Sequence, residues 1–456
     1  MKRRHFIHQS LYVSVGFIGL SRCSMDRKIT EELFRYGPLE KDPDGYLDLP
    51  KGFSYNIISR EGEKMIDGFL VPGAADGMAA FGTADGKVIL IRNHELSPGS
   101  KSHGPFGKDN ELLNNLDKNM LYDYGEGESP SLGGTTTLIY NEDTRKVELQ
   151  YLSLAGTNRN CAGGPTPWGS WITCEEDMTV SGNGQEKNHG YNFEVPASAT
   201  AQLAEPIALK DMGRFNHEAI CVSPQTSIVY QTEDRNDSLI YRFIPKTPGK
   251  LHEGGKLQAL AIKNQKSFNT TNWAERSIDL FTPFDVEWID LDNVDSPLDD
   301  LRFRGFDKGA AMFARGEGMW YGQDEIFFAC TSGGPNKLGQ VFKYIPSPFE
   351  GTLRESESPG KLILFAESDN KNILKNCDNL TVAPWGDIVL CEDHKDAFLR
   401  GITPEGQIYT LGHNVGSKSE FAGACFSPSG NTLFVNIQGP GDTLAITGPW
   451  TAQLPI

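Results

Sequence analysis

The sequence predicts an all-β protein, and its internal repeats favour a six-bladed β-propeller with loop insertions. Its 456 residues include 49 glycines and 26 prolines, and 10% of them are aromatic. This content of turn formers is too high for a helical protein, and 38% hydrophobic residues is too high for a disordered chain. The composition therefore favours many short strands joined by turns and loops.

Internal repeats are the clearest structural signal in the chain. Two segments are near copies, Pro167–Asp177 and Pro384–Asp393, and each predicts a tight turn into a strand that ends in acids. Looser versions of this unit occur at Ala79–Glu95, Glu218–Asp234, Glu317–Thr331 and Phe421–Gln438. The predicted turns therefore lie near residues 85, 168, 224, 323, 385 and 429.

Six similar hairpins in one all-β chain predict six blades. Four-stranded blades take roughly 40 to 50 residues each, or about 240 to 300 for six, and loop insertions account for the remainder. The alternative is a pair of sandwich domains, but no composition break or linker divides the chain. Residues 25–456 are therefore expected to form a single propeller domain.

Residues 1–24 resemble an export signal. Arg3-Arg4 precede Phe6 and the apolar run Leu11–Leu20, which is too short to cross a bilayer, and no other segment is long enough. The paired arginines resemble the twin-arginine signal of bacteria, whose export machinery carries folded proteins to the periplasm or beyond. An ordinary secretory signal is the alternative. Lipidation at Cys23 is a weaker possibility, because Arg22 fits a lipidation box poorly.

The charge of the chain limits its partners. Lysine and arginine number 43 against 60 acidic residues, which leaves a net charge of −17. This sign repels nucleic-acid backbones and argues against nucleic acid as a partner. The sequence leaves the oligomeric state open.

The repeats also predict where polar side chains gather. The start and the end of a hairpin lie at the same end of its two strands, so residues at both places should converge. Residues at the starts are Cys161, Glu218, Arg315 with Glu317, Asp378 and Glu420; those at the ends are Asn93–Glu95, Glu175–Asp177, Glu233–Arg235 and Glu392–His394. Such a density of carboxylates at one mouth of the propeller is unfavourable without counter-charge, and bound cations would supply it.

The residue types suggest a mixed metal site. Carboxylates suit hard cations such as calcium, whereas a thiolate suits a transition metal. Cys161 and Cys377 lie in polar loops, while the cysteines of the apolar runs are expected to be buried thiols. The familiar zinc, EF-hand, Walker and serine-hydrolase motifs are absent from the sequence.

Arg315 is a candidate substrate clamp. Gly316 follows it directly and Gly318 follows Glu317, which leaves room for a ligand to approach. Its guanidinium group fits phosphate oxygens. A salt bridge that only neutralises Glu317 is the alternative. His94 and His217 each precede a glutamate, and each is either a ligand, an orienting group or a structural residue.

Several of these stretches together resemble the signature blocks of the PhoX-type bacterial alkaline phosphatases. The blocks are Asn160–Glu176, Gly213–Ala219, Thr232–Arg235, Arg315–Trp320, Cys377–Asp393 and Ser419–Trp450. The similarity runs from about Asn93 to the C-terminus. It implies a six-bladed propeller that hydrolyses phosphomonoesters outside the cytoplasm, with an iron and calcium cluster at its mouth. In that cluster a cysteine thiolate and an oxo group bridge the iron ions.

The resemblance also assigns roles to residues. It implies that Cys161 is the bridging cysteine, that Arg315 binds phosphate, and that Arg315 and Glu233 act in catalysis. The acidic ligands would be Glu176, Glu233, Glu317 and Asp378. Glu95, Glu392 and Asp393 are added as ligands by repeat position, and His94 as a second substrate-binding residue.

Two other functions fit an acidic propeller mouth. One is a calcium-dependent lactonase, although a lone calcium site has no use for the thiolate of Cys161. The other is a non-catalytic propeller whose acids hold structural calcium.

Overall fold

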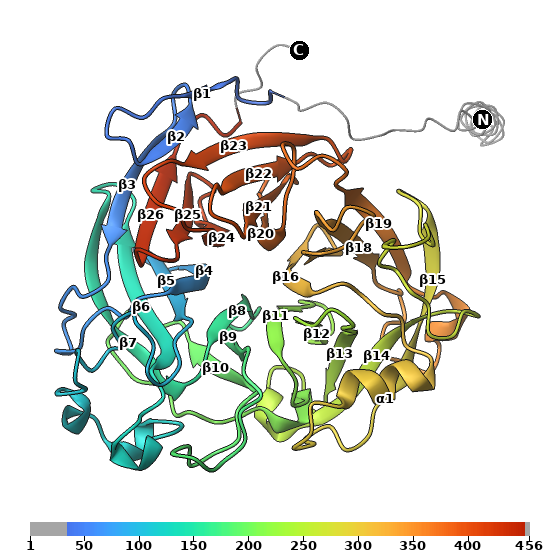
Figure 1. The fold of residues 1–456 in the computed structure, drawn as a ribbon, viewed down its shortest axis with the longest axis horizontal. Helices are drawn as coiled ribbons and strands as arrows, with labels where there is room; N and C mark the ends of the chain where they lie inside the picture. Colours follow the sequence, from blue (N-terminus) through green and yellow to red (C-terminus); the bar gives the residue numbers. More distant parts are fainter. Residues whose placement is uncertain (1–33, 452–456) are drawn as a thin grey trace, which may run out of the picture.

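The computed structural model describes residues 34–451, which form strands arranged radially around a central axis (Figure 1). The predicted signal segment 1–24, with Cys23, lies outside the described residues. Six inner strands line the axis: β4 (Ala75–Gly82), β8 (Asn160–Pro165), β11 (His217–Val222), β16 (Gly316–Gly322), β20 (Cys377–Val382) and β24 (Phe421–Phe426). Each contacts the next, and β24 contacts β4, so the ring is closed.

Each inner strand pairs antiparallel with the strand that follows it in the chain. These second strands are β5 (Val88–His94), β9 (Ser170–Glu175), β12 (Val229–Glu233), β17 (Glu325–Cys330), β21 (Ile388–Glu392) and β25 (Thr432–Ile437). The turns between the partners fall where the repeats predict them. The prediction of an all-β propeller is confirmed.

Outer strands extend these hairpins away from the axis. They are β6 (Gly133–Asn141), β7 (Lys146–Thr157), β10 (Asn192–Pro196), β13 (Ile240–Pro245), β14 (Gly255–Ile262), β18 (Gln340–Ile345), β19 (Lys361–Glu367), β22 (Phe398–Ile402), β23 (Ile408–Asn414) and β26 (Asp442–Thr447). The chain also has one α-helix, α1 (Leu301–Lys308), among the described residues, and short 3-10 helices at Leu113–Asn115, Lys118–Met120, Gly125–Gly127, Lys210–Met212, Leu251–Glu253 and Glu355–Glu357.

The strand pairing departs from six separate sheets. In residues 34–451 the hydrogen-bonded sheets number five, because β15 (Pro283–Asp290) pairs with both β14 and β19 and joins two blades into one nine-stranded sheet. The expectation of six separate four-stranded sheets is therefore corrected. The inserted strand β15 lies between two blades and pairs with the edge strands β14 and β19, which would otherwise have unpaired edges.

The N-terminal strands close the ring. Strand β3 (Ser54–Ser59) pairs with β26 and so completes the sheet formed by the C-terminal strands. Strand β2 (Leu47–Pro50) pairs with β23, and β1 (Leu39–Glu40) pairs with β2. Joining the first and last parts of the chain in one sheet leaves no break in the ring, which holds the inner strands in fixed positions.

The hydrophobic core lies between neighbouring sheets and along the axis. One cluster joins Ile172 of β9 to Ile220 of β11 and Tyr241 of β13, each almost fully buried. Along the axis the inner strands come very close: a Cβ atom on Gly77 would lie 2.6 Å from Cα of Ala162. The axial hollow at this level measures only about 20 Å³. Within residues 34–451, no helix has the length and apolar character needed to cross a membrane.

Candidate metal centre

A β-bulge near the start of each inner strand positions the polar residues. In β4, Ala75 pairs with His94 and Met78 with Arg92, so Asp76 and Gly77 together oppose one residue of the partner strand. The same shift follows the paired first residues of β8, β11, β16 and β20, and in β24 it follows the second residue, Ala422. A bulge bends its strand and re-aims the extra side chain.

The second residue of every inner strand therefore has an equivalent position. We call this set the axial ring; it consists of Asp76, Cys161, Glu218, Glu317, Asp378 and Ala422. All but Ala422 carry a side chain able to bind a metal ion. Small residues follow most of them, and Gly318 shows why: a Cβ atom there would lie 2.6 Å from Cα of Asn379.

A second equivalence concerns the residue that follows each second strand. The backbone N–H of Glu176 donates to the carbonyl of Arg159, the residue just before β8, at 2.9 Å. The same bond recurs in the other five hairpins: Glu95 to Ala74, Asp234 to Asn216, Thr331 to Arg315, Asp393 to Asn376 and Gln438 to Glu420. We call the donors the exit ring and the acceptors the rim positions. Because of these bonds, the exit ring and the rim positions lie at the same mouth of the propeller as the axial ring.

The side chains of these rings form two groups that could hold metal ions. Ligand atoms of Cys161, Glu176 and Glu218 lie within 4.8 Å of one another, and so do those of Glu218, Glu317 and Asp378. Glu218 belongs to both groups. Two cation positions that share one carboxylate are the arrangement of a multinuclear centre.

Burial makes this cluster unfavourable without positive charge. Burial, then the carboxylates of Glu176 and Asp378, raise the pKa of Glu218 far above its usual value. Burial, with Asp234 and Asp378, does the same for Glu317. Burial raises the pKa of Glu176 to about 8, even though Arg159 opposes the shift. A bound cation would favour the ionised forms of all three.

Cys161 is buried beside this cluster. Its sulfur faces the carbonyl oxygens of His217 at 3.4 Å and Glu218 at 3.7 Å. Burial, then the charges of Glu218 and Glu176, raise the pKa of the thiol well above its usual value. The thiolate would therefore form only with a cation next to it.

Two arginines bring positive charge to the mouth. Arg315 donates to both carboxylate oxygens of Asp234, at 2.7 Å each, and to Glu317 at 2.8 Å. Arg159 donates to Glu95 at 2.8 Å and to Glu176 at 2.5 Å. Burial opposes the charge of Arg315, but Asp234 and Glu317 raise its pKa above the usual range. Both guanidinium groups stay charged.

The predicted ligand Glu233 lies away from both groups. It accepts a hydrogen bond from the hydroxyl of Tyr241 at 2.7 Å and faces Arg302 at 3.7 Å. Glu233 pairs with His217 inside the strand ladder, whereas the next residue, Asp234, is in the exit ring. Neighbouring side chains of a strand point to opposite sides. Glu233 therefore lies inside the sheet, while the next residue, Asp234, lies at the mouth.

Glu392 has the same internal position as Glu233. It accepts hydrogen bonds from the backbone N–H of Lys375 and from Nε of Arg400, and it faces His394 at 3.1 Å. The exit-ring residue of this hairpin is Asp393. Glu392 therefore fastens the loop after β21 and is not in either metal-binding group.

Glu95 and His94 are separated in the same way. Glu95 is in the exit ring and accepts from Arg159 and from the amide of Gln438. His94 is buried, with one ring nitrogen 2.9 Å from the carbonyl of Gly73 and the other 2.8 Å from the hydroxyl of Thr136. Burial, then Arg92, lowers the pKa of His94 well below its usual value. The structure does not bring His94 to the cluster.

The ring equivalence also reveals residues that the sequence does not single out. Asp76 and Arg159 were unassigned, and Glu218 and Asp234 appeared only among the polar residues at the hairpin ends. The signal that finds them is an alignment of the six hairpins with one bulge in each inner strand. The sequence does not mark the bulge, so Glu233 is predicted one position before the exit residue Asp234, and Glu392 is predicted beside the exit residue Asp393.

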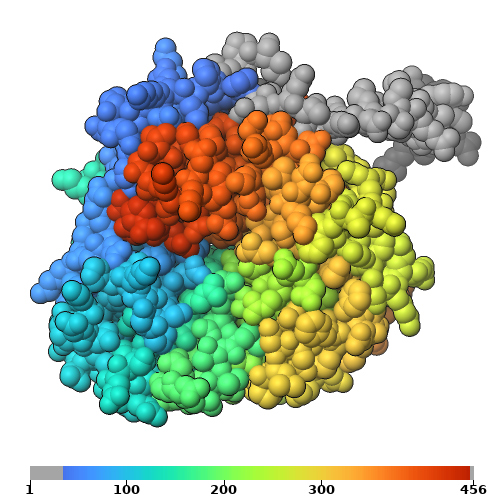
Figure 2. All heavy atoms as spheres, in the orientation of Figure 1, coloured from blue at the N-terminus to red at the C-terminus, as the bar shows by residue number. Residues whose placement is uncertain are grey.

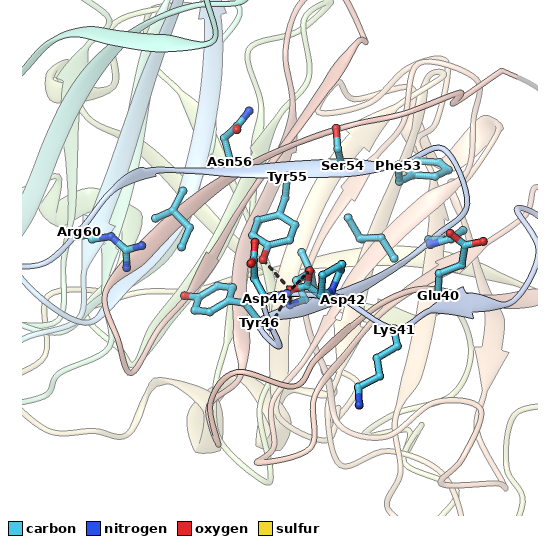
Figure 3. A pocket seen from close by; sticks show the side chains of 15 residues that line it. Glu40, Lys41, Asp42, Asp44, Tyr46, Phe53, Ser54, Tyr55, Asn56 and Arg60 are labelled. Atoms are coloured by element: carbon cyan, nitrogen blue, oxygen red, sulfur yellow. Dashed lines mark hydrogen bonds between the residues drawn. The ribbon is translucent and has the colours of Figure 1, made fainter.

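A hollow of about 650 Å³ lies away from this cluster and is lined by residues of the N-terminal segment between Glu40 and Arg60 (Figure 3). The carboxylate of Asp42 in this hollow already accepts from the backbone N–H of Tyr46 and Leu47 and from the hydroxyl of Tyr55. Its polar groups therefore hold a turn together.

A profile described as alkaline phosphatase PhoX matches residues 34–441. The chain belongs to the PhoX family. It is therefore a phosphatase, its substrates are small-molecule phosphoesters, and the family is metal-dependent. Among curated proteins, no sequence matches.

Solved structures support the fold. PhoX of Pseudomonas fluorescens, solved in complex with vanadate, a transition state analogue, matches with a TM-score of 0.65 and 16% identity. The match covers 92% of this chain and 99% of that one. A gluconolactonase from Xanthomonas campestris matches with a TM-score of 0.41 and 12% identity, over 91% of this chain and 98% of that one. The second likeness is too low to carry an argument.

Proposed function

We propose that this PhoX-family phosphatase is an exported enzyme that hydrolyses phosphomonoesters at an iron and calcium cluster in the propeller mouth. The observation that carries the proposal is the pair of candidate metal groups joined by Glu218. Carboxylate oxygens alone would suit calcium, and the sulfur of Cys161 adds a ligand suited to iron. The donor set therefore fits a mixed cluster.

The cluster residues would divide the work. Cys161 and Glu176 with Glu218 would hold one part of the cluster, and Glu317 and Asp378 with Glu218 the other. When bound, the cations supply positive charge for the phosphate oxygens and lower the pKa of water. Glu233, Glu392 and His94 have no role in this proposal because they lie outside both candidate metal groups.

Arg315 would bind and orient the phosphate. Asp234 fixes its guanidinium plane through two parallel hydrogen bonds, and the side chain remains 32% exposed. A guanidinium group held in this way can donate to non-bridging phosphate oxygens without first losing rotamer freedom. It would also favour the negative charge that develops during transfer of the phosphoryl group.

Export rests on the sequence alone. The twin arginines Arg3-Arg4 and the short apolar run after them support export of the folded protein to the periplasm or the exterior. Loading of the metals before export would be compatible with this route. Lipidation at Cys23 stays a prediction, and Arg22 directly before it fits a lipidation box poorly.

Metal analysis together with activity assays tests the proposal. Protein purified after native export should contain both iron and calcium and should release phosphate from phosphomonoesters. Chelation should abolish this activity. A lactonase assay on the same sample should show no turnover. Full phosphatase activity in protein that holds neither metal would overturn the cluster, and lactone hydrolysis without phosphate release would overturn the function.

A further inference from the structure

Arg159 and Arg315 occupy equivalent rim positions. Each directly precedes an inner strand, and its carbonyl accepts the backbone N–H of the exit residue of the same hairpin, at 2.9 and 3.0 Å. Both have a left-handed backbone, with φ of 44° and 55°. The rim residues Ala74 and Asn376 share this conformation, with φ of 46° and 52°, so it belongs to the rim position and orients both arginines alike. The other rim positions carry no arginine: they are Ala74, Asn216, Asn376 and Glu420.

Both guanidinium groups are held in the same manner. In each, Nε and Nη2 donate to two carboxylates: Arg159 to Glu95 and Glu176, and Arg315 to Asp234 and Glu317. In the part of the chain that the structure describes, Nη1 of neither arginine has a hydrogen-bond partner. The side chains are 41% and 32% exposed. Each arginine therefore presents one donor edge to the mouth.

The two arginines contact different metal-binding groups, and these groups share Glu218. Arg159 binds Glu176, a member of the first metal-binding group, while Arg315 binds Glu317, a member of the second. Asn216 links the two sides, because its amide donates to Glu176 at 2.8 Å and to the carbonyl of Asp234 at 3.1 Å. The arginines are thus fixed relative to each other by one continuous polar chain.

We propose that Arg159 is a second phosphate-binding residue, acting together with Arg315 on the same phosphoryl group. This inference rests on the proposed function. A phosphomonoester dianion has three non-bridging oxygens, so two guanidinium edges can bind different oxygens at once. Two donors held by different metal-binding groups would fix the orientation of the phosphoryl group as well as its position, which a single arginine does not do.

The test compares binding of inorganic phosphate by four single variants of the metal-loaded enzyme. Arg159→Ala and Arg315→Ala should each raise the inhibition constant of phosphate by about ten- to a hundredfold. Iron and calcium contents should stay at the parental level. Arg159→Lys should recover part of the affinity, because a point charge replaces a planar fork. Arg145→Ala is the matched control, since Arg145 is also left-handed, with φ of 55°, but lies exposed in the turn between β6 and β7.

The double variant Arg159→Ala with Arg315→Ala gives the decisive comparison. If both arginines bind one phosphate, the double variant binds it more weakly than either single variant. An unchanged inhibition constant in Arg159→Ala would overturn the inference, and so would loss of metal in parallel with loss of affinity, which would make Arg159 a support for Glu176 alone. Failure of the proposed function is distinct, because the parent itself would then lack phosphomonoesterase activity or metals.

Discussion

Glu233 and Asp234 are neighbours in the chain, yet they lie in different environments. Glu233 accepts a hydrogen bond from Tyr241 inside the sheet, and Asp234 binds Arg315 at the mouth. The same division separates Glu392 from Asp393 and Glu175 from Glu176. Acidic pairs at the strand ends thus serve two purposes: the first acid fastens the loop that follows, and the second faces the cluster.

This division predicts opposite effects for two glutamates. Glu218→Gln should lose most bound metal, because Glu218 is the member common to both groups. Glu233→Gln should keep its metal and lose stability, by about 1 to 3 kcal/mol, because it weakens the buried contacts with Tyr241 and Arg302. Elemental analysis and urea unfolding of both variants would check this. Loss of metal from Glu233→Gln with unchanged stability would contradict it.

Replacement of Cys161 tests the thiolate. Cys161→Ser should remove iron and lower kcat/KM by about a hundredfold or more, because a hydroxyl is a poor bridging ligand. The fold should persist, as judged by circular dichroism. Cys425→Ala is the control, since Cys425 is buried in an apolar cluster with Phe434 and Leu138. Normal iron content in Cys161→Ser would remove this residue from the cluster.

Variants of Arg315 and Glu317 should distinguish substrate binding from metal binding. A charge-assisted hydrogen bond contributes about 1.5 to 3 kcal/mol, so Arg315→Ala should lose about ten- to a hundredfold in kcat/KM. Its metal content should not change, whereas Glu317→Ala should lose metal. Kinetics and elemental analysis on the same preparations measure both effects. An Arg315→Ala enzyme as active as the parent would leave only a salt bridge with Glu317.

Because the inner strands approach one another closely, one added methyl group between them should destabilise the protein. Gly318→Ala should destabilise the protein by about 1 to 3 kcal/mol, because its Cβ atom would lie 2.6 Å from the backbone of Asn379. Displacement of β16 should also reduce metal binding through Glu317. Gly412→Ala should have a smaller effect, since its nearest neighbour is a leucine side chain at 3.3 Å. Chemical unfolding distinguishes the two, and equal effects would refute the packing argument.

His189 predicts a pH dependence of stability. Its ring nitrogens face Glu175 at 2.7 Å and Asp123 at 3.3 Å. Burial opposes its charge, but Glu175 and Asp123 raise its pKa to about 10. This folded-state pKa exceeds the unfolded value of about 6.5. The contribution of His189 to the free energy of unfolding is therefore full below about pH 6.5 and declines by about 1.4 kcal/mol per pH unit until about pH 10.

The measurement is the difference in unfolding free energy between the parent and His189→Gln from pH 5.5 to 10. The difference should be largest near pH 6 and shrink as the pH rises. His103→Gln, at an exposed histidine beside Glu61, should show little of this trend. A difference that is constant over the whole range would exclude a charged His189.

The sequence by itself determined the repeating hairpin. Each turn, such as Asp85-Gly86 or Trp168-Gly169, is a local signal, because glycine permits the backbone that the turn requires, and the strands on both sides are apolar. Counting these units was enough to predict a propeller with its polar ends at one mouth. The sequence also predicted that Cys161, Glu317 and Asp378 lie at this mouth, because each stands at the start of a repeated hairpin.

Only the tertiary structure placed Asp234, and not Glu233, at the cluster, whereas the family resemblance had already selected Glu176 over Glu175. The bulge in each inner strand arises where six strands converge on the axis, and it depends on contacts between strands far apart in the sequence, such as Gly318 against Asn379. A shift of one residue reverses the side to which a side chain points. The extra strand β15 and the pairing of Arg159 with Glu95 and Glu176 likewise depend on contacts between separate hairpins, which no local pattern encodes.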